Sequence, residues 1–122
     1  MSTLKIAARD AATGPVVEIT GDLDYDTAHE LRAFITTLVL HPGQRLVLDL
    51  AHLELCDSSG IGALILARNH AQAAQAGVAL AAVPGNTLRV LRILGLEQVF
   101  AIYPDTRAAT RKDMPPAMRR SG

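Results

Sequence analysis

Residues 45–64 read RLVLDLAHLELCDSSGIGAL, and the fold can be worked out from this stretch. Residues 45–50 form an apolar run with the length of a strand buried inside a sheet. Residues 56–64, CDSSGIGAL, place an acid, two serines and two glycines ahead of a long apolar segment. Asp and Ser have side-chain oxygens that accept hydrogen bonds from the first N–H groups of a helix. We therefore expect a central strand followed by a helix that begins near Ser59.

The segment before this stretch predicts two strands, a loop and a helix. Apolar residues alternate with polar ones from Leu4 to Ile19, and a Thr-Gly-Pro turn signal interrupts them, which predicts a hairpin or two adjacent strands. Residues 21–26, GDLDYD, are expected to form a loop. Thr27 and Glu30 have the spacing of a capping box at the start of the next helix, which His-Pro-Gly ends.

The segment after the stretch continues the alternation, with the helix from Ser59 expected to end near Ala76. The further expected elements are a strand at 78–83, a helix from Pro84 to Gly95, a strand at 99–103 and a short helix at 105–112. This order predicts an α/β fold, a single compact domain with a mixed, mostly parallel sheet of about five strands and helices packed on it. We expect the domain to span residues 1–112 and residues 113–122 to be a disordered tail.

Composition narrows the class of protein. The chain has 122 residues and one cysteine, Cys56, which favours a reducing compartment. Its first residues show no signal-peptide pattern, and no apolar run reaches the length that spans a bilayer. Net charge is zero, with nine acids and four bases in residues 1–57 and three acids and eight bases in residues 58–122. We expect a cytoplasmic protein whose bulk charge does not indicate nucleic acid or a membrane as its partner.

The Asp-Ser-Ser-Gly stretch has two interpretations. In the first, Asp57 and the serines only cap the helix. In the second, one serine hydroxyl is modified. Gly60 and Gly62 favour the second, because each weakens the first helical turn by about 0.5–1 kcal/mol relative to alanine, so stability alone would not select them. At about 100° per residue, Ser59 and Gly62 share one side of the helix, where another molecule could approach closely.

Charge makes a phosphate at this position chemically reasonable. A helix N-terminus offers free N–H donors and the positive end of the helix dipole, so the fold tolerates a phosphate there. Asp57 and the acidic 21–26 segment would place the new negative charge beside existing negative charge, which changes what can dock. Ile61 and Ile65 form an apolar stripe on this helix, which is either a partner contact or part of the core.

Other chemistry finds little support in the sequence. Neither serine has glycines both two before and two after it, as the nucleophile elbow of hydrolases requires. The four histidines contain no pair four residues apart and there is no cysteine cluster, so no metal site is expected. There is no Walker-type phosphate loop. We expect no enzyme and no cofactor, and the chain is better suited to be the substrate of a kinase than a kinase.

Four stretches of the chain together carry a family resemblance. They are GDLDYDTAHEL at 21–31, LVLDL at 46–50, LCDSSGIGALILAR at 55–68 and VALAAVPGNTLRVLRILGLEQVF at 78–100. In this order and spacing they resemble the anti-sigma factor antagonists of bacteria, which belong to the STAS domain family. The resemblance covers roughly residues 4–110, and the Asp-Ser-Ser-Gly block after a Leu-Asp-Leu strand is its most specific part.

The resemblance implies a function and a set of site residues. Members of the family bind an anti-sigma factor with serine kinase activity, and phosphorylation of the second serine of the block, here Ser59, releases it. The expected partner-binding positions are Asp24, Asp57, Ser58, Gly60, Ile61 and Gly62. The expected partners are such an anti-sigma factor and a serine phosphatase, with no direct contact to nucleic acid or membrane.

The sequence-based hypothesis is therefore an anti-anti-sigma factor that controls sigma-factor-dependent transcription through phosphorylation of Ser59. The alternative is a STAS domain that does not switch and serves as an accessory or scaffold module. Examples are a subunit of a lipid-transport complex, part of a sensor assembly or a nucleotide-binding module. The same fold is expected in both cases.

Overall fold

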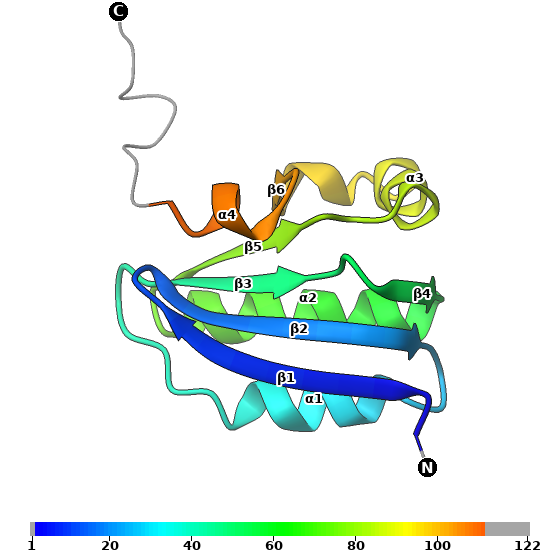
Figure 1. Cartoon of the computed structure of the whole chain (residues 1–122), viewed down its shortest axis with the longest axis horizontal. Helices are drawn as coiled ribbons and strands as arrows, with labels where there is room; N and C mark the ends of the chain where they lie inside the picture. The colour runs from blue at the N-terminus through cyan, green and yellow to red at the C-terminus, as the bar shows by residue number, and fades with distance from the viewer. Residues whose placement is uncertain (1, 112–122) are drawn as a thin grey trace, which may run out of the picture.

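Residues 2–111 are described by a computed structural model of the protein, in which strands and helices alternate along the chain (Figure 1). The elements are β1 (Leu4–Ala11), β2 (Gly14–Leu23), α1 (Ala28–Thr36), β3 (Arg45–Asp49), β4 (Leu53–Cys56), α2 (Ser58–Ala73), β5 (Gly77–Ala81), α3 (Gly85–Ile93), the 3₁₀ turn η1 (Leu96–Gln98), β6 (Ala101–Tyr103) and α4 (Thr106–Ala109). The tail that we predicted at 113–122 lies outside the described residues.

One sheet joins all the strands in the order β1-β2-β3-β5-β6, with β4 paired to β2 beyond the end of β3. β1 and β2 form an antiparallel hairpin, and every other pair is parallel. β3 pairs with residues 16–18 of β2, and β4 pairs with residues 21–23 after an irregularity in the register. The prediction of a mixed, mostly parallel sheet is confirmed, with six strands in place of about five.

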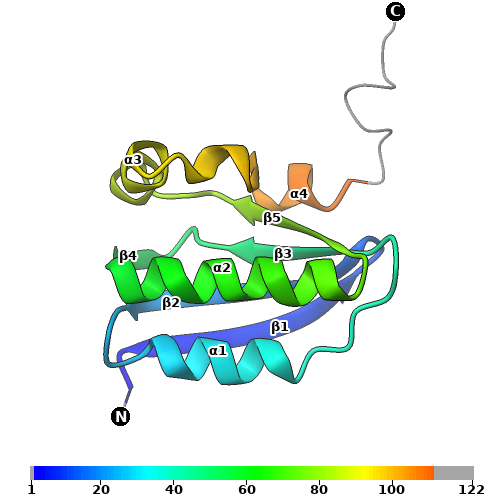
Figure 2. The ribbon, with the colours of Figure 1, turned by 180° about the vertical axis from the view of Figure 1, so that it is seen from behind.

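Helices cover the two faces of the sheet unequally. α1 and α2 lie side by side on one face, as Figure 2 shows, and the main core lies between them and the sheet. Side chains alternate between faces along a strand, so Val17 points into this core while Val16 points to the opposite face. There Val16 and Val47 pack with alanines of β5 and with Ala109 of α4 in a second, smaller cluster.

The structure corrects several predicted boundaries. Residues 21–23 belong to β2 and not to the predicted loop, because they pair with β4. The strand β4 was missed altogether, since it is short and only Leu53 in it is fully buried. The predicted capping box is wrong. The Thr27 side chain makes no cap hydrogen bond, and its Oγ1 instead donates to the carbonyl oxygen of Asp22 at 2.7 Å.

The parallel pairing of β2 with β4 positions the candidate site. Parallel neighbours end at the same edge of a sheet, so the segment after Leu23 and the segment after Cys56 leave the sheet side by side. The first of these segments leads into α1 and the second into α2. Within residues 2–111, no helix has the combination of length and apolar composition that crossing a membrane would require.

Candidate functional site

The candidate site is the N-terminus of α2 together with the loop between β2 and α1. Leu23 and Cys56 are paired residues at the ends of their strands, so Asp24 and Asp57 follow on neighbouring segments. The Asp57 N–H donates to the carbonyl oxygen of Leu23 at 3.3 Å, which continues the strand pairing into the site. The two acids that the sequence singled out are therefore brought together by the sheet.

Asp57 caps α2 and also connects it to the neighbouring loop. Its Oδ1 accepts hydrogen bonds from the N–H groups of Ser59, at 2.9 Å, and Gly60, at 3.1 Å. Its Oδ2 accepts a hydrogen bond from the N–H of Tyr25, at 3.1 Å. The structural interpretation of the Asp-Ser-Ser-Gly block as a helix cap is thus confirmed for Asp57. One carboxylate sets both the start of the helix and the position of the loop.

Asp24 holds the loop itself in shape. Its Oδ1 accepts from the N–H groups of Asp26, at 3.0 Å, and Thr27, at 3.2 Å, and from the Thr27 hydroxyl at 3.2 Å. The Asp24 N–H in turn donates to Thr27 Oγ1 at 2.9 Å. These local bonds make a rigid turn, so the loop presents a defined surface beside the start of α2.

The two serines differ from Asp57 in that their side chains make no hydrogen bond within residues 2–111. Ser58 is exposed and Ser59 is half-buried. Neither hydroxyl forms a hydrogen bond with a described residue, although the backbone N–H of Ser59 is bound by Asp57. The Ser59 hydroxyl is therefore not engaged in a hydrogen bond that the fold would have to break for the hydroxyl to react.

The two glycines of the first turn are explained differently. A Cβ on Gly60 would collide with the carbonyl oxygen of Leu23 and stand 2.8 Å from Sγ of Cys56, so close packing against β2 and β4 requires glycine there. A Cβ on Gly62 would meet nothing within 4 Å, and Gly62 is exposed. Intrachain packing explains Gly60 and leaves Gly62 unexplained.

The other predicted site residue on α2 lies inside the molecule. Ile61 is 3% exposed and belongs to the main core. Of the two interpretations of the isoleucine stripe, a partner contact or part of the core, the second is therefore correct for Ile61. Cys56 is half-buried beneath the same turn. Burial, and to a lesser degree the negative charge of Asp57, raises the pKa of the Cys56 thiol to about 12. The thiol therefore stays protonated near neutral pH.

Sequence reasoning missed two exposed apolar side chains beside the site. Tyr25, whose N–H is bound by Asp57, has 80% of its surface exposed, and Leu55 of β4 has 46% exposed. Tyr25 could have been noticed, because it is an aromatic residue between two acids with no apolar neighbour to pack on. Leu55 could not, because its exposure depends on the irregular pairing of β4 with β2.

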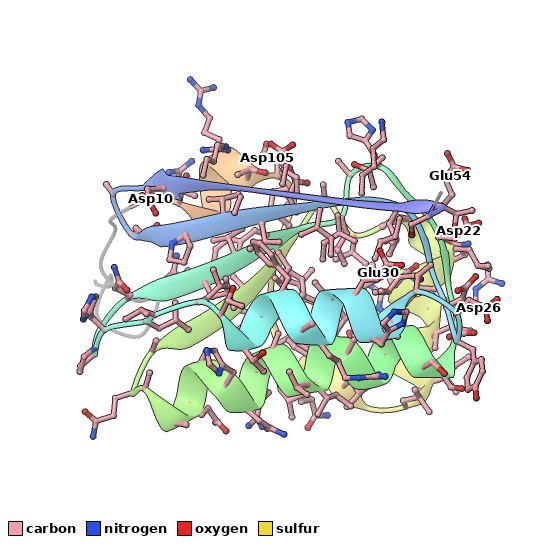
Figure 3. The ribbon with its side chains drawn as sticks, turned by 90° about the horizontal axis from the view of Figure 1, so that it is seen from below. Asp10, Asp22, Asp26, Glu30, Glu54 and Asp105 are labelled. Carbon is pink, nitrogen blue, oxygen red and sulfur yellow. The ribbon has the colours of Figure 1, made fainter. Side chains whose placement is uncertain are left out.

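Carboxylates surround this end of the molecule. Asp22, Asp26, Glu30 and Glu54 lie toward one end of the molecule in Figure 3. A shallow pocket of about 370 Å³ is lined by Asp22, Asp24, Asp26 and Glu30 together with hydroxyl residues. None of these carboxylates forms an ion pair with another described residue. Among residues 2–111, no three His, Cys, Asp or Glu side chains are grouped so that they could hold a metal ion.

Comparison with known proteins places this chain in a family. A family model described as "Mlab, STAS domain" matches residues 6–103. A STAS-domain containing protein of Pseudomonas aeruginosa (strain UCBPP-PA14) is 31% identical over 101 residues, which cover 81% of this chain and 99% of that protein. The chain belongs to the STAS domain family, as the resemblance of its motifs implied.

Solved structures agree with this assignment. An anti-sigma factor antagonist from Mycobacterium paratuberculosis is 25% identical and superposes with a TM-score of 0.76, over 87% of this chain and 90% of that one. The Bacillus cell fate determinant SpoIIAA in its phosphorylated form is 19% identical with a TM-score of 0.66, over 86% of this chain and 96% of that one. At that identity the second likeness shows a common fold.

Proposed function

We propose that this protein is an anti-sigma factor antagonist that is switched by phosphorylation of Ser59. In its unphosphorylated form it binds an anti-sigma factor with serine kinase activity and so frees a sigma factor for transcription. Phosphorylation of Ser59 releases the partner, and a serine phosphatase restores binding. The observation that carries the proposal is a hydroxyl at the start of α2 that makes no hydrogen bond within residues 2–111, beside a glycine that packing does not require.

The proposed contact surface follows from which residues face outward. Ser58 and Gly62 are exposed, and Tyr25 lies on the adjoining loop with most of its surface in solvent. Asp24 and Asp57 keep this loop and the helix start in place through their hydrogen bonds. Ile61 is left out of the contact surface because it is buried, and Gly60 serves by letting the turn pack closely.

A phosphate on Ser59 would change the surface without unfolding the helix. The positive end of the α2 dipole tolerates the added charge of about −1.5 to −2. The N–H groups of Ser59 and Gly60, however, are already bound to Asp57, so the phosphate cannot be neutralised by them while the cap persists. The charge therefore adds to that of Asp57 and the acidic loop, beside which a partner has to dock.

The magnitudes are compatible with a switch. Disturbing a charge-sensitive interface centre typically costs about 2–5 kcal/mol of binding free energy. Moving an equilibrium from 1:99 to 99:1 requires about 5.5 kcal/mol. Only the upper end of the first range comes close to this value, and competition by the sigma factor for the same anti-sigma factor supplies the remainder.

The test compares the two adjacent serines. The purified protein is bound to its anti-sigma factor, ATP is added, and release is followed together with the intact mass of the chain. We expect Ser59→Ala to stay bound without gaining a phosphate. Ser58→Ala is the matched control and should be phosphorylated and released like the natural protein. Release of the Ser59→Ala variant after ATP addition would contradict the assignment of Ser59.

A second candidate function is a STAS module that does not switch, such as an accessory or scaffold subunit. The observation that favours it is that the matching family model and the Pseudomonas aeruginosa relative are both described by the STAS domain, which the two kinds of protein share. Intact-mass analysis after incubation with ATP and a lysate of the source cells separates the two. A gain of one phosphate on Ser59 supports the switch, and copurification with membrane transport subunits without phosphorylation supports the scaffold.

A further inference from the structure

A second pocket lies at the opposite end of the molecule from Ser59. It has a volume of about 450 Å³ and is lined by Ala12, Thr13, Pro42, Gly43, Gln44, Arg45 and Arg111. The Gly43 N–H donates to the carbonyl oxygen of Gln75, so the pocket adjoins the C-terminal end of α2. The 16 residues of α2 span about 24 Å at 1.5 Å per residue, which separates this pocket from the candidate site.

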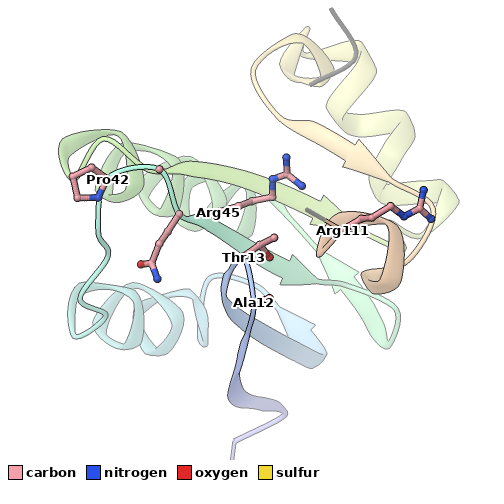
Figure 4. A pocket seen from close by; sticks show the side chains of 7 residues that line it. Ala12, Thr13, Pro42, Arg45 and Arg111 are labelled. Carbon is pink, nitrogen blue, oxygen red and sulfur yellow. The ribbon is translucent and has the colours of Figure 1, made fainter. Parts of the chain in front are cut away.

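Three separate segments of the chain build the pocket, as Figure 4 shows. Thr13 is in the turn of the β1–β2 hairpin, Arg45 begins β3, and Arg111 follows α4. The Arg45 N–H donates to the carbonyl oxygen of Thr13 at 2.8 Å and holds the hairpin turn against β3. Both charged side chains that line the pocket are arginines, and none of its described lining residues is acidic. The positive charge of Arg45 makes this cavity attractive to anions.

Arg45 is held in a fixed orientation with donors to spare. Its Nη1 donates to the carbonyl oxygen of Ala109 at 2.8 Å, and its guanidinium lies 5.3 Å from the centre of the Tyr103 ring. A guanidinium has five N–H donors in a planar fork, of which this hydrogen bond uses one. Its carbonyl and aromatic partners are both uncharged, so its positive charge is not neutralised by a described carboxylate. A guanidinium held in this way is suited to a phosphate group.

Thr13 supplies an independent sign of a missing partner. Its Oγ1 is buried and forms no hydrogen bond. Every other buried side-chain nitrogen or oxygen among the described residues has a hydrogen-bond partner. A buried polar group without a partner is costly, and its presence commonly indicates a water, ion or ligand. The hydroxyl belongs to a residue that lines the pocket beside Arg45.

We propose that this pocket binds the phosphate group of a small molecule, with the Arg45 guanidinium and the Thr13 hydroxyl as its ligands. The volume lies within the range of pockets that hold small ligands, about 300–1,000 Å³, and exceeds the need of a bare phosphate ion. The chemistry points to a phosphate monoester, with inorganic phosphate as the simplest form of the same group. This inference does not rest on the proposed function of Ser59.

The test is an NMR titration of the full chain, in a buffer without phosphate and at constant ionic strength, with inorganic phosphate and with glycerol 3-phosphate. We expect saturable shifts of the Thr13, Gln44 and Arg45 signals. Tighter binding of glycerol 3-phosphate would show that the ester is the ligand, and equal binding that the free ion suffices. Shifts that grow linearly without saturation for both probes would overturn the proposal.

Variants separate the pocket from a general charge effect. Arg45→Gln should weaken binding at least about tenfold, the loss expected for a hydrogen bond to a charged group. Arg107→Gln makes the same charge change on an exposed residue of α4 outside the pocket and should leave affinity unchanged. If the spectrum of Arg45→Gln shows that it does not fold, Arg45→Lys replaces it, with a smaller loss. Equal affinity in the Arg45 and Arg107 variants would refute the site.

Thr13→Val tests the hydroxyl on its own. The substitution keeps the shape of the side chain and removes a group that has no partner within residues 2–111, so the protein without phosphate should be at least as stable. Phosphate affinity should fall by about tenfold or more, which corresponds to one hydrogen bond to a charged group. A loss of stability without any loss of affinity would show that the hydroxyl serves the fold and not a ligand.

Discussion

The first turn of α2 has a buried side, which faces the sheet, and an exposed side, and different factors explain the residues on each. We call them the inward side and the outward side. On the inward side, Gly60 and Ile61 are buried, and an added Cβ at Gly60 would strike the backbone of β2. On the outward side, Ser58 and Gly62 are exposed, and an added Cβ at Gly62 would meet open space. Packing accounts for the inward residues. The outward residues need another reason, which in our proposal is the approach of a partner to Ser59.

The largest effect on the inward side is expected from Gly60→Ala. The new Cβ would press on the Leu23 carbonyl oxygen, which is backbone and cannot rotate away, so the free energy of unfolding should fall by about 1–3 kcal/mol. Urea denaturation followed by circular dichroism measures this. Gly62→Ala is the matched control in the same turn. Equal stability of the natural protein and Gly60→Ala would refute the close packing that we describe.

The next largest effect should come from Asp57→Ala, which removes the connection between the two sides. Loss of the helix cap should lower the free energy of unfolding by about 0.5–2 kcal/mol. The Tyr25 N–H also loses its acceptor, so its NMR signal should shift strongly. Asp57→Asn keeps an acceptor oxygen and should retain most of the stability. An unchanged Tyr25 signal in the alanine variant would contradict the link between helix and loop.

Gly62→Ala should change stability in the opposite direction. Alanine favours a helix over glycine by about 0.5–1 kcal/mol, and the site has room for the methyl group, so the free energy of unfolding should rise by about that amount. In our proposal the same variant binds the anti-sigma factor more weakly, because the methyl group stands beside Ser59. A variant that is more stable and binds equally well would remove Gly62 from the proposed contact surface.

The smallest effect concerns Cys56 beneath the inward side. Its pKa is raised from 9.0 to about 12, chiefly by burial, so native protein should react slowly with iodoacetamide at pH 7.5 and unfolded protein in urea quickly. The folded state holds the thiol proton more tightly than the unfolded state. The thiol's contribution to stability is therefore complete below pH 9.0 and is lost as the pH rises towards about 12.

Cys56→Ala is the control for this pH dependence, because it removes the titrating group. Its free energy of unfolding should fall less steeply above pH 9.0 than that of the natural protein. Parallel curves for the two proteins, or fast alkylation of the native thiol, would show that the inward side is more open than the structure indicates.

Much of the fold could be predicted because strong periodic patterns carry it. The run at 45–50 is largely apolar, with Leu46, Val47 and Leu48 in succession, as expected for a central strand, and the alternation from Leu4 to Ile19 has the two-residue period of a strand. The strand β4 was missed because it is short and mostly exposed, and because its pairing with β2 follows a register irregularity that has no local signature. Because of the same irregularity, residues 21–23 were assigned to a loop.

The site was predicted in part. Asp57 was identified as a cap from the chemistry of its side chain alone. Its third hydrogen bond, to Tyr25, spans 32 positions of the sequence and depends on β2 and β4 lying in parallel. Thr27 shows the reverse case, since its capping-box spacing with Glu30 suggested a local bond, and the tertiary structure offered its hydroxyl a carbonyl oxygen in β2 instead.

By itself, the sequence determined the alternation of strands and helices, the cap at Asp57 and the presence of two hydroxyls at the start of a helix. These features depend on residues that are only a few positions apart, so the sequence shows their spacing directly. Only the tertiary structure decided that Ile61 is buried, that packing requires glycine at position 60 but not at position 62, and that Thr13 and Arg45 share a pocket. Each of these depends on atoms that the packing of the sheet brings together from distant positions.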